Sequence, residues 1–296
     1  MKRVFCITPL LSACSHIAMG QTPLEITLID DNAPEGFVKV FSKQVDVFGL
    51  KVYATAKTPD VKVLHAANVL AQYIDNDADG QPDNALVFKM MIKHKAAIIM
   101  TATEREFEQL DVHRYIPEEV WDSMGLQLLY GEETHPGGVD RGKFDAALEE
   151  VLHLITQWGY AKAYPDVFGE KPGTAIAKAM DRARGGHFLK VPEKYPEGAW
   201  FTYYDKTCDY ACQITEYIYW GLTSILGAQD FPGRSEEIRE EWKLNTAAKV
   251  KQGDPMLYKL LTDPKYSFPT KLPDGKYNPR KNAEPSAPTD AGKPCC

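Results

Sequence analysis

Hydrophobic and polar residues follow two different periods along the chain. Between residues 25 and 58 they alternate and β-branched residues are frequent, over the stretches EITLID, GFVKVFS and VDVFGLKVYATA. Alternation places every second side chain on one face of a strand, so this region predicts two or three β-strands. From residue 60 onward, apolar residues recur mostly at three- and four-residue spacing, which predicts helices.

The helical part also contains short, continuous apolar runs that are typical of buried strands. These runs predict strands over 95–101 and 126–130. The expected helices cover 60–74, 85–94, 103–110, 144–160, 176–184, 209–226 and 235–251. The order of elements therefore predicts a single α+β domain, strand-rich in its N-terminal part and helical in its C-terminal part.

The composition is that of a globular domain. Of the 296 residues, 44% are hydrophobic and 25% are charged, which is enough apolar material to bury one substantial core. We expect this domain to span 21–278. The last stretch, 279–296, is rich in Pro and polar residues and predicts a disordered tail.

The first 20 residues, 1–20, have the pattern of a leader that directs export. Two basic residues precede a short apolar run over 4–11, and small residues follow, as in a secretory signal peptide. The sequence LSAC, which ends at Cys14, also resembles a bacterial lipobox, whereas cleavage near Gly20 would release a free product. We therefore expect a secreted, periplasmic or cell-surface protein, with a membrane link only through a lipid anchor at Cys14.

The charge balance argues against nucleic acid as a partner. The chain has 34 Lys and Arg against 41 Asp and Glu, a formal charge of −7, and loss of Lys2 and Arg3 with the leader makes it −9. Basic residues do not gather in a run that could follow a phosphate backbone.

Four of the six cysteines lie outside the leader: Cys208, Cys212, Cys295 and Cys296. In an oxidising compartment they could pair locally, as Cys208 with Cys212, or join the tail to the domain. The sequence leaves both pairings open. A local pair four residues apart would require an irregular turn, since a bridge inside a regular helix is strained.

The stretch EEVLH, at 149–153, lies in a helix with two distinct faces. Apolar residues such as Val151 form a stripe that must face the core, while Glu149 and His153 lie one turn apart on the other face, with Glu150 beside them. One interpretation is an exposed ion pair that stabilises the helix slightly. The other is a row of metal ligands, because zinc accepts carboxylate oxygen as well as imidazole.

A later helix, 209–226, supplies another candidate ligand. Glu216 lies opposite its core stripe but between Tyr217 and other aromatic residues, so the helix is apolar nearly all the way round. Burying an unpaired carboxylate is unfavourable. Glu216 should therefore contact a metal, a histidine or a tyrosine hydroxyl.

Together these two helices resemble the zincin superfamily of metallopeptidases, in particular its gluzincin branch, although the motif here is EExxH in place of HExxH. The resemblance implies that Glu150 is the general base, that His153 and Glu216 bind zinc, and that the substrate is a peptide or protein. Glu149 stands in the place of the first histidine ligand. His135, in the loop before the motif helix, is the natural replacement for it. The resemblance covers the motif helix and, more loosely, the helix after Cys208.

The acidic stretch DNDADGQPD predicts a calcium loop. Oxygen ligands recur at alternate positions around the sharp turn at its glycine, in an order similar to the loops of EF-hands and thrombospondin type 3 repeats. The expected ligands are Asp75, Asp77, Asp79, the carbonyl of Gln81, and Asp83. Such a site would pin the two flanking helices together.

Three functions follow from these patterns and remain open at this point. The first is an exported, calcium-stabilised, zincin-like metalloprotein with zinc-dependent peptidase activity. The second is a non-catalytic binding module on a degenerate metallopeptidase scaffold, which would contact its partner through the aromatic stretch 199–204. The third is a different metal-dependent hydrolase. Whether Glu149, His153 and Glu216 or His135 converge in space discriminates between them.

Overall fold

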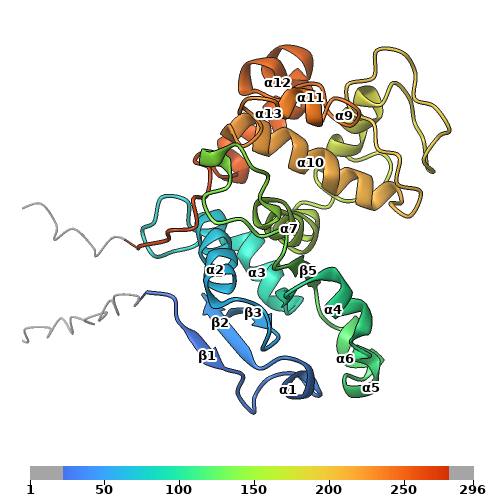
Figure 1. Ribbon diagram of the computed structural model, residues 1–296. Coiled ribbons are helices and arrows are strands. Elements are labelled where there is room, and N and C mark those ends of the chain that lie inside the picture. Colours follow the sequence, from blue (N-terminus) through green and yellow to red (C-terminus); the bar gives the residue numbers. More distant parts are fainter. Residues whose placement is uncertain (1–22, 280–296) are drawn as a thin grey trace, which may run out of the picture.

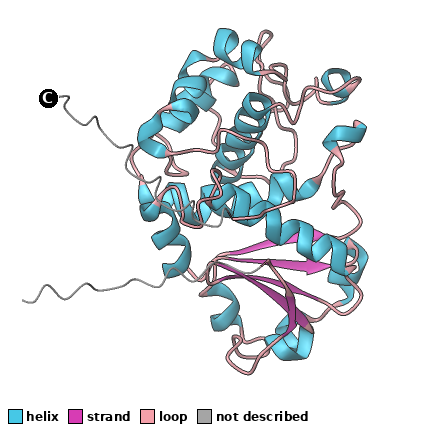
Figure 2. Cartoon of the chain, turned by 90° about the vertical axis from the view of Figure 1, so that its left-hand side faces the viewer, coloured by secondary structure: helices cyan, strands magenta, loops and turns pink. Residues whose placement is uncertain are grey.

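The five strands of the N-terminal half form one mixed sheet, drawn in magenta in Figure 2. The structure is a computed structural model that describes residues 23–279, so the expectations for the leader, the tail and their cysteines lie outside the described residues. The strands are β1 (Ile26–Leu28), β2 (Lys43–Val47), β3 (Leu50–Ala54), β4 (Ala97–Thr101) and β5 (Leu126–Tyr130), which follow one another in the sheet in that order.

The sheet has an antiparallel part and a parallel part, and only β2 runs opposite to the other four strands. The first three strands pair antiparallel, and β4 and β5 add parallel strands on one side. A two-residue turn joins β2 to β3, and both of its residues, Phe48 and Gly49, have positive φ, as a tight hairpin requires. The antiparallel part comes from the alternating region of the sequence, and β4 is the buried apolar run.

The helices fall mainly in the C-terminal half, which confirms the α+β class and the expected distribution of elements. The elements labelled η1 and η3 are short 3₁₀ helices. The element η2 is a π-helical turn that continues α7. The elements are α1 (Phe37–Val40), α2 (Asp60–Ile74), α3 (Ala85–Lys93), α4 (Glu104–Gln109), α5 (Val112–Tyr115), α6 (Glu118–Asp122), η1 (Val139–Arg141), α7 (Ala146–Ile155), η2 (Thr156–Tyr160), α8 (Ala161–Ala163), α9 (Ala175–Ala183), α10 (Tyr210–Leu226), α11 (Arg234–Glu237), α12 (Ala247–Gly253), α13 (Pro255–Thr262) and η3 (Pro264–Tyr266).

The sheet separates a large core from a small one. In β4, Ile98 and Met100 belong to the large core, which continues through α2, α7 and α10 to the C-terminal helices. Ile99, on the opposite face, joins Phe37 and Tyr53 in the small core. Alternate side chains of a strand point to opposite faces, so one strand contributes to both cores. The motif helix α7 thus lies between the sheet and the C-terminal helices (Figure 1).

Two sequence expectations were wrong. The stretch 36–42 is the short helix α1 rather than a strand, because a helical turn brings Phe37 and Phe41 together and buries both against Tyr53. The expected helix 235–251 breaks after α11, because the chain turns inward to bury Trp242, which pairs with Phe201 in an isolated β-bridge. Helix α12 begins only at Ala247.

Cys208 and Cys212 form the local disulfide. Cys208 precedes the first residue of α10, so the irregular turn that such a bridge requires is present, and the two Cα atoms are 5.2 Å apart. A disulfide is consistent with a compartment outside the reducing cytoplasm. Among the described helices, none has the length and apolar character to cross a membrane.

Candidate metal centre

Both faces of helix α7 are covered by other parts of the protein. Asp145 caps the helix by accepting a hydrogen bond from the Ala147 N–H, and Val151 and Ile155 are buried in the large core. The other face, which could have been solvated, is covered as well: His153 is only 6% exposed. The interpretation of a freely exposed helix face therefore does not hold at His153.

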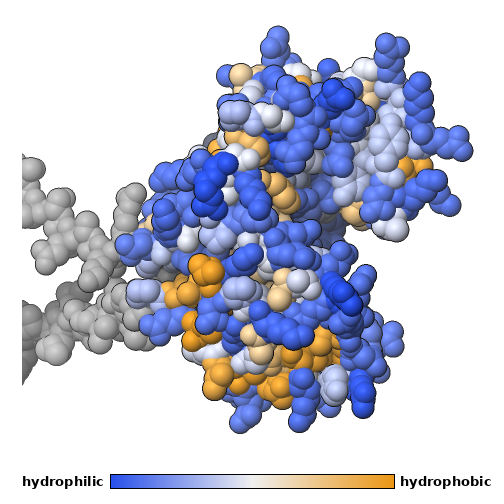
Figure 3. Space-filling view, viewed as in Figure 1, coloured by the Kyte–Doolittle hydropathy of each residue, from blue (hydrophilic) through white to orange (hydrophobic). Residues whose placement is uncertain are grey.

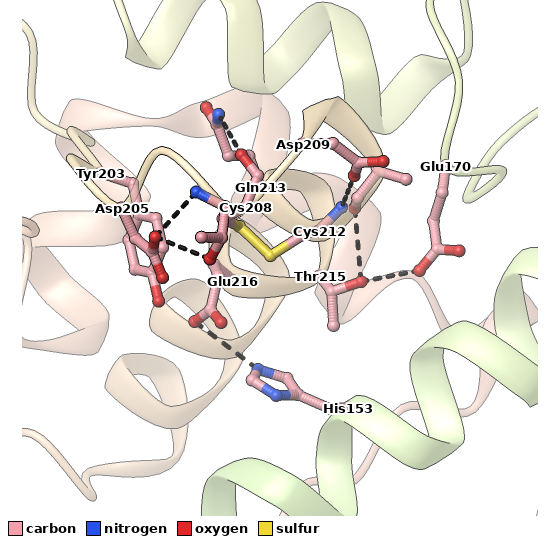
Figure 4. The surroundings of a disulfide bond; sticks show 12 residues. His153, Glu170, Tyr203, Asp205, Cys208, Asp209, Cys212, Gln213, Thr215 and Glu216 are labelled. Atoms are coloured by element: carbon pink, nitrogen blue, oxygen red, sulfur yellow. Dashed lines mark hydrogen bonds and ion pairs between the residues drawn. A yellow bond between two sulfur atoms is a disulfide. The ribbon is translucent and has the colours of Figure 1, made fainter. Parts of the chain in front are cut away.

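Helix α10 covers that face of α7. Its N-terminus is capped by Asp209, which accepts a hydrogen bond from the Cys212 N–H, and its C-terminus ends at Gly227 in the left-handed conformation. Aromatic residues on most sides keep α10 inside the protein, as its sequence predicts. Glu216 is therefore only 8% exposed and faces His153, which is shown in Figure 4.

Glu149, His153 and Glu216 converge into one group, hereafter the EHE group. One ligand atom from each lies within 4.8 Å of the other two. The Nε2 atom of His153 is 3.6 Å from an Oε2 atom of Glu216. Both of these atoms are buried, and neither has a hydrogen-bond partner within the described part of the chain.

Burial and crowding of negative charge shape the ionisation of the group. Burial raises the pKa of Glu149 well above its usual value, and the neighbouring Glu216 carboxylate raises it further. Burial also raises the pKa of Glu216. For His153, burial alone would lower the pKa, but the Glu216 and Glu150 carboxylates raise it to about 10. In the absence of another cation, the imidazole is thus the positive charge that the carboxylates share.

The EHE group fits a transition-metal ion. Two ligands of one tetrahedral zinc ion, each bound at about 2.0–2.1 Å, lie about 3.4 Å apart. The 3.6 Å between His153 Nε2 and Glu216 Oε2 is close to this separation. A buried imidazole nitrogen and a buried carboxylate oxygen without hydrogen-bond partners are also the donor atoms that such an ion takes.

Glu150 occupies a different position from Glu149. Its Oε2 atom accepts a hydrogen bond of 2.5 Å from the Gln127 side chain of β5. The same oxygen lies 3.5 Å from Nδ1 of His153. Glu150 therefore approaches the ring nitrogen that faces away from Glu216.

Three further side chains lie near the group, and the sequence patterns did not place them at this site. Glu170 accepts a hydrogen bond from Thr215, and burial raises its pKa (Figure 4). Tyr203 donates a hydrogen bond that lowers the pKa of Glu216. Burial and the Glu216 carboxylate raise the pKa of Glu241. These residues come from irregular segments, where no periodic pattern predicts a neighbour.

The other histidines lie elsewhere. His135 is not part of the EHE group; its backbone N–H donates to Asp145, and its Nδ1 atom is buried without a hydrogen-bond partner among residues 23–279. His187 is half-exposed and contacts Asp181. Glu149, in the place of the missing histidine, is thus the residue that the structure brings to His153 and Glu216.

The acidic loop brings three of its expected ligands together. Carboxylate oxygens of Asp75, Asp77 and Asp83 lie within 4.8 Å of one another. Asp79 is not part of this group, and its carboxylate accepts a hydrogen bond from the Gln81 N–H. The carbonyl of Gln81 stays a predicted ligand. Asp75 is buried, whereas the other two members of the group are exposed.

The aromatic stretch 199–204 is largely internal. Ala199 and Phe201 are buried, and Tyr204 is the large side chain of this stretch that is well exposed, at 49%. Apolar surface gathers instead on the half of the molecule that holds the sheet (Figure 3), where Leu28 and Val38 are exposed. A partner that binds through apolar contacts would find more of them there.

Comparisons of the chain with protein-family models, with curated proteins and with solved structures find no match. The zincin resemblance therefore rests on the motif residues, and their burial and geometry are the observations that bear on function.

Proposed function

We propose that this protein is a zincin-like metalloprotein in which Glu149, His153 and Glu216 hold zinc, and that it hydrolyses peptide bonds. One observation carries the proposal: the His153 Nε2 and Glu216 Oε2 atoms are buried, lack hydrogen-bond partners in the described chain, and lie 3.6 Å apart. A buried acceptor left in this state is unfavourable without a cation.

Zinc would supply Lewis-acid chemistry, in that it polarises a carbonyl group and makes a water molecule more acidic. The chain's own residues supply proton transfer and orientation. The resemblance gives the role of general base to Glu150, and the structure places Glu170 and Glu241 near the group as further carboxylates. Of the tyrosines, Tyr203 is the one that hydrogen-bonds to Glu216, so we favour it as the hydroxyl that stabilises negative charge.

Elemental analysis of the purified protein tests zinc binding. We expect about one zinc ion per chain in the wild type and its loss in His153→Ala and Glu216→Ala, because each removes one of three ligands. His187→Ala, which removes an exposed histidine, is the matched control and should keep the metal. Circular dichroism confirms that each variant is folded.

The same samples connect binding to function. Cleavage of a casein substrate should stop when a chelator is added and return when zinc is restored. Zinc retained in both ligand variants would contradict the proposed site. A folded wild type that takes up no zinc would instead favour the non-catalytic binding module on a degenerate scaffold.

We also propose calcium at the acidic loop. Carboxylate oxygens of Asp75, Asp77 and Asp83 converge there, and calcium takes oxygen ligands of this kind. Binding at millimolar calcium, as outside cells, would stabilise the fold by about 1 kcal/mol.

The temperature of unfolding, measured with and without 2 mM calcium, checks this site. We expect an increase of about 2–4 °C in the wild type, which disappears in Asp77→Ala. Asp79→Ala is the control, since it removes the same charge from the same loop but not from the group of three. An increase that persists in Asp77→Ala would show that calcium binds elsewhere.

A further inference from the structure

The two ring nitrogens of His153 face two different carboxylates. Nε2 lies 3.6 Å from Glu216, and Nδ1 lies 3.5 Å from Glu150. Helix geometry explains this arrangement. Glu149 lies four residues before His153, and Glu150 lies three residues before it. The two glutamates are therefore on neighbouring rows of the helix, one on each side of the histidine. One row meets α10, and the other meets β5.

Glu150 is anchored from outside its own helix. Gln127 in β5 donates to Oε2 of Glu150, the oxygen that also approaches His153. The strand therefore fixes the carboxylate in the position that it takes beside the imidazole. Gln127 is a polar residue in the otherwise apolar sequence LQLLY, and this contact accounts for its presence.

We infer that Glu150 is a positioning residue for His153, an inference that rests on the proposed zinc site. A histidine that binds metal through Nε2 must carry its proton on Nδ1, and an acceptor at Nδ1 fixes both this tautomer and the ring orientation. Glu150 is that acceptor, and Gln127 holds it in place. This role departs from the resemblance, which makes the same glutamate the general base.

Zinc affinity, measured by competition with a chromophoric chelator, tests the inference. Loss of an acceptor behind a metal-binding histidine lowers metal affinity about 10–100-fold. We expect a loss of this size in Glu150→Ala and a smaller loss in Glu150→Gln, because the amide oxygen can still accept from Nδ1. Gln127→Leu should weaken binding in the same direction without changing Glu150. Glu118→Gln, a change on the distant helix α6, is the control.

Cobalt substitution gives a second readout, since the visible spectrum of the cobalt protein reports on ligand geometry. It should change in Glu150→Ala and Gln127→Leu and stay unchanged in Glu118→Gln. Should Glu150→Ala or Glu150→Gln fail to fold, Gln127→Leu alone decides.

Two outcomes separate this inference from the function on which it rests. If the wild type binds zinc, and the Glu150 and Gln127 variants bind it equally tightly while Glu150→Gln loses hydrolysis, Glu150 is the general base and the inference is wrong. If the folded wild type binds no zinc, the proposed function itself fails.

Discussion

At the scale of single residues, Asp254 shows how a buried carboxylate outside the candidate centre obtains its hydrogen-bond partners. Asp254, which is 1% exposed, accepts hydrogen bonds from the Trp200 indole and the Tyr217 hydroxyl and also caps α13 through the Leu257 N–H. His153 and Glu216 differ, because an atom of each is buried without a hydrogen bond within residues 23–279. Together with their convergence, this contrast with Asp254 is why we regard the EHE group as a candidate metal site.

The metal-free EHE group should destabilise the fold. Burial raises the pKa of Glu149, so the folded protein disfavours its charged form at neutral pH. Glu149→Gln should therefore stabilise the chelator-treated protein at pH 7, by about 1 kcal/mol or about 2–4 °C in unfolding temperature. Unfolding in the presence of chelator measures this difference.

The raised pKa of Glu149 also makes the stability of the metal-free protein depend on pH. A carboxyl whose folded pKa is raised binds its proton more tightly in the folded state, so the metal-free wild type gains stability as pH falls. The advantage of Glu149→Gln should shrink towards pH 4.5, the ordinary pKa of a glutamate. A variant that is less stable than the wild type at pH 7 would contradict this account.

At the scale of elements, segments with a clear hydrophobic pattern were predictable, whereas α1, whose composition is that of a strand, was not. The helices α2 and α10 agree with the sequence because many residues contribute to each periodic pattern. The strand β4 agrees because its short apolar run is unbroken. The stretch that became α1 has a strand-like composition, and only its contacts in the small core make it a helix.

The residues of the candidate centre likewise divide into those that the sequence could predict and those that it could not. Glu149, His153 and Glu216 could be selected from helix faces, because spacing along a helix determines which side chains lie together. Gln127 and Tyr203 could not, because local sequence does not say which strand or irregular segment will lie beside a helix face.

Helix α1 depends on the glycine at its N-terminus, Gly36. Its φ is +84°, and a Cβ atom there would lie 2.0 Å from the backbone oxygen of Tyr115. Gly36→Ala should therefore lower the free energy of unfolding by more than about 2 kcal/mol, measured by urea denaturation. Gly173→Ala is the control: its φ is +91° but the space around it is open, so it should lose only about 1 kcal/mol. Equal losses in the two variants would show that α1 does not depend on the close approach.

At the scale of the whole molecule, the last described segment packs back on an early part of the chain. Residues 267–277, hereafter the strap, lie along α2 and the acidic loop (Figure 1). Asn76 accepts hydrogen bonds from the N–H groups of Thr270 and Lys271 and donates one to the Lys271 carbonyl. The strap thereby joins the C-terminal end of the described chain to α2, the helix between β3 and β4.

Asn76→Ala should loosen the strap. Losing the hydrogen bonds of this side chain at a partly exposed site should lower the free energy of unfolding by about 2 kcal/mol. Hydrogen exchange should accelerate in 270–277, while the exchange of β4 stays slow. The exposed Asn32, changed to Ala, serves as the control. An unchanged exchange rate in 270–277 would mean that Asn76 does not hold the strap.

The strap also bears on how the protein is made. Asn76 and Lys271 are 195 positions apart, and a ribosome adds about 5–20 residues per second, so roughly 10–40 s separate their synthesis. During that interval α2 and the acidic loop have emerged, but the segment that covers them does not yet exist. The nascent chain is therefore at risk of binding chaperones or proteases at this surface until its synthesis is almost complete.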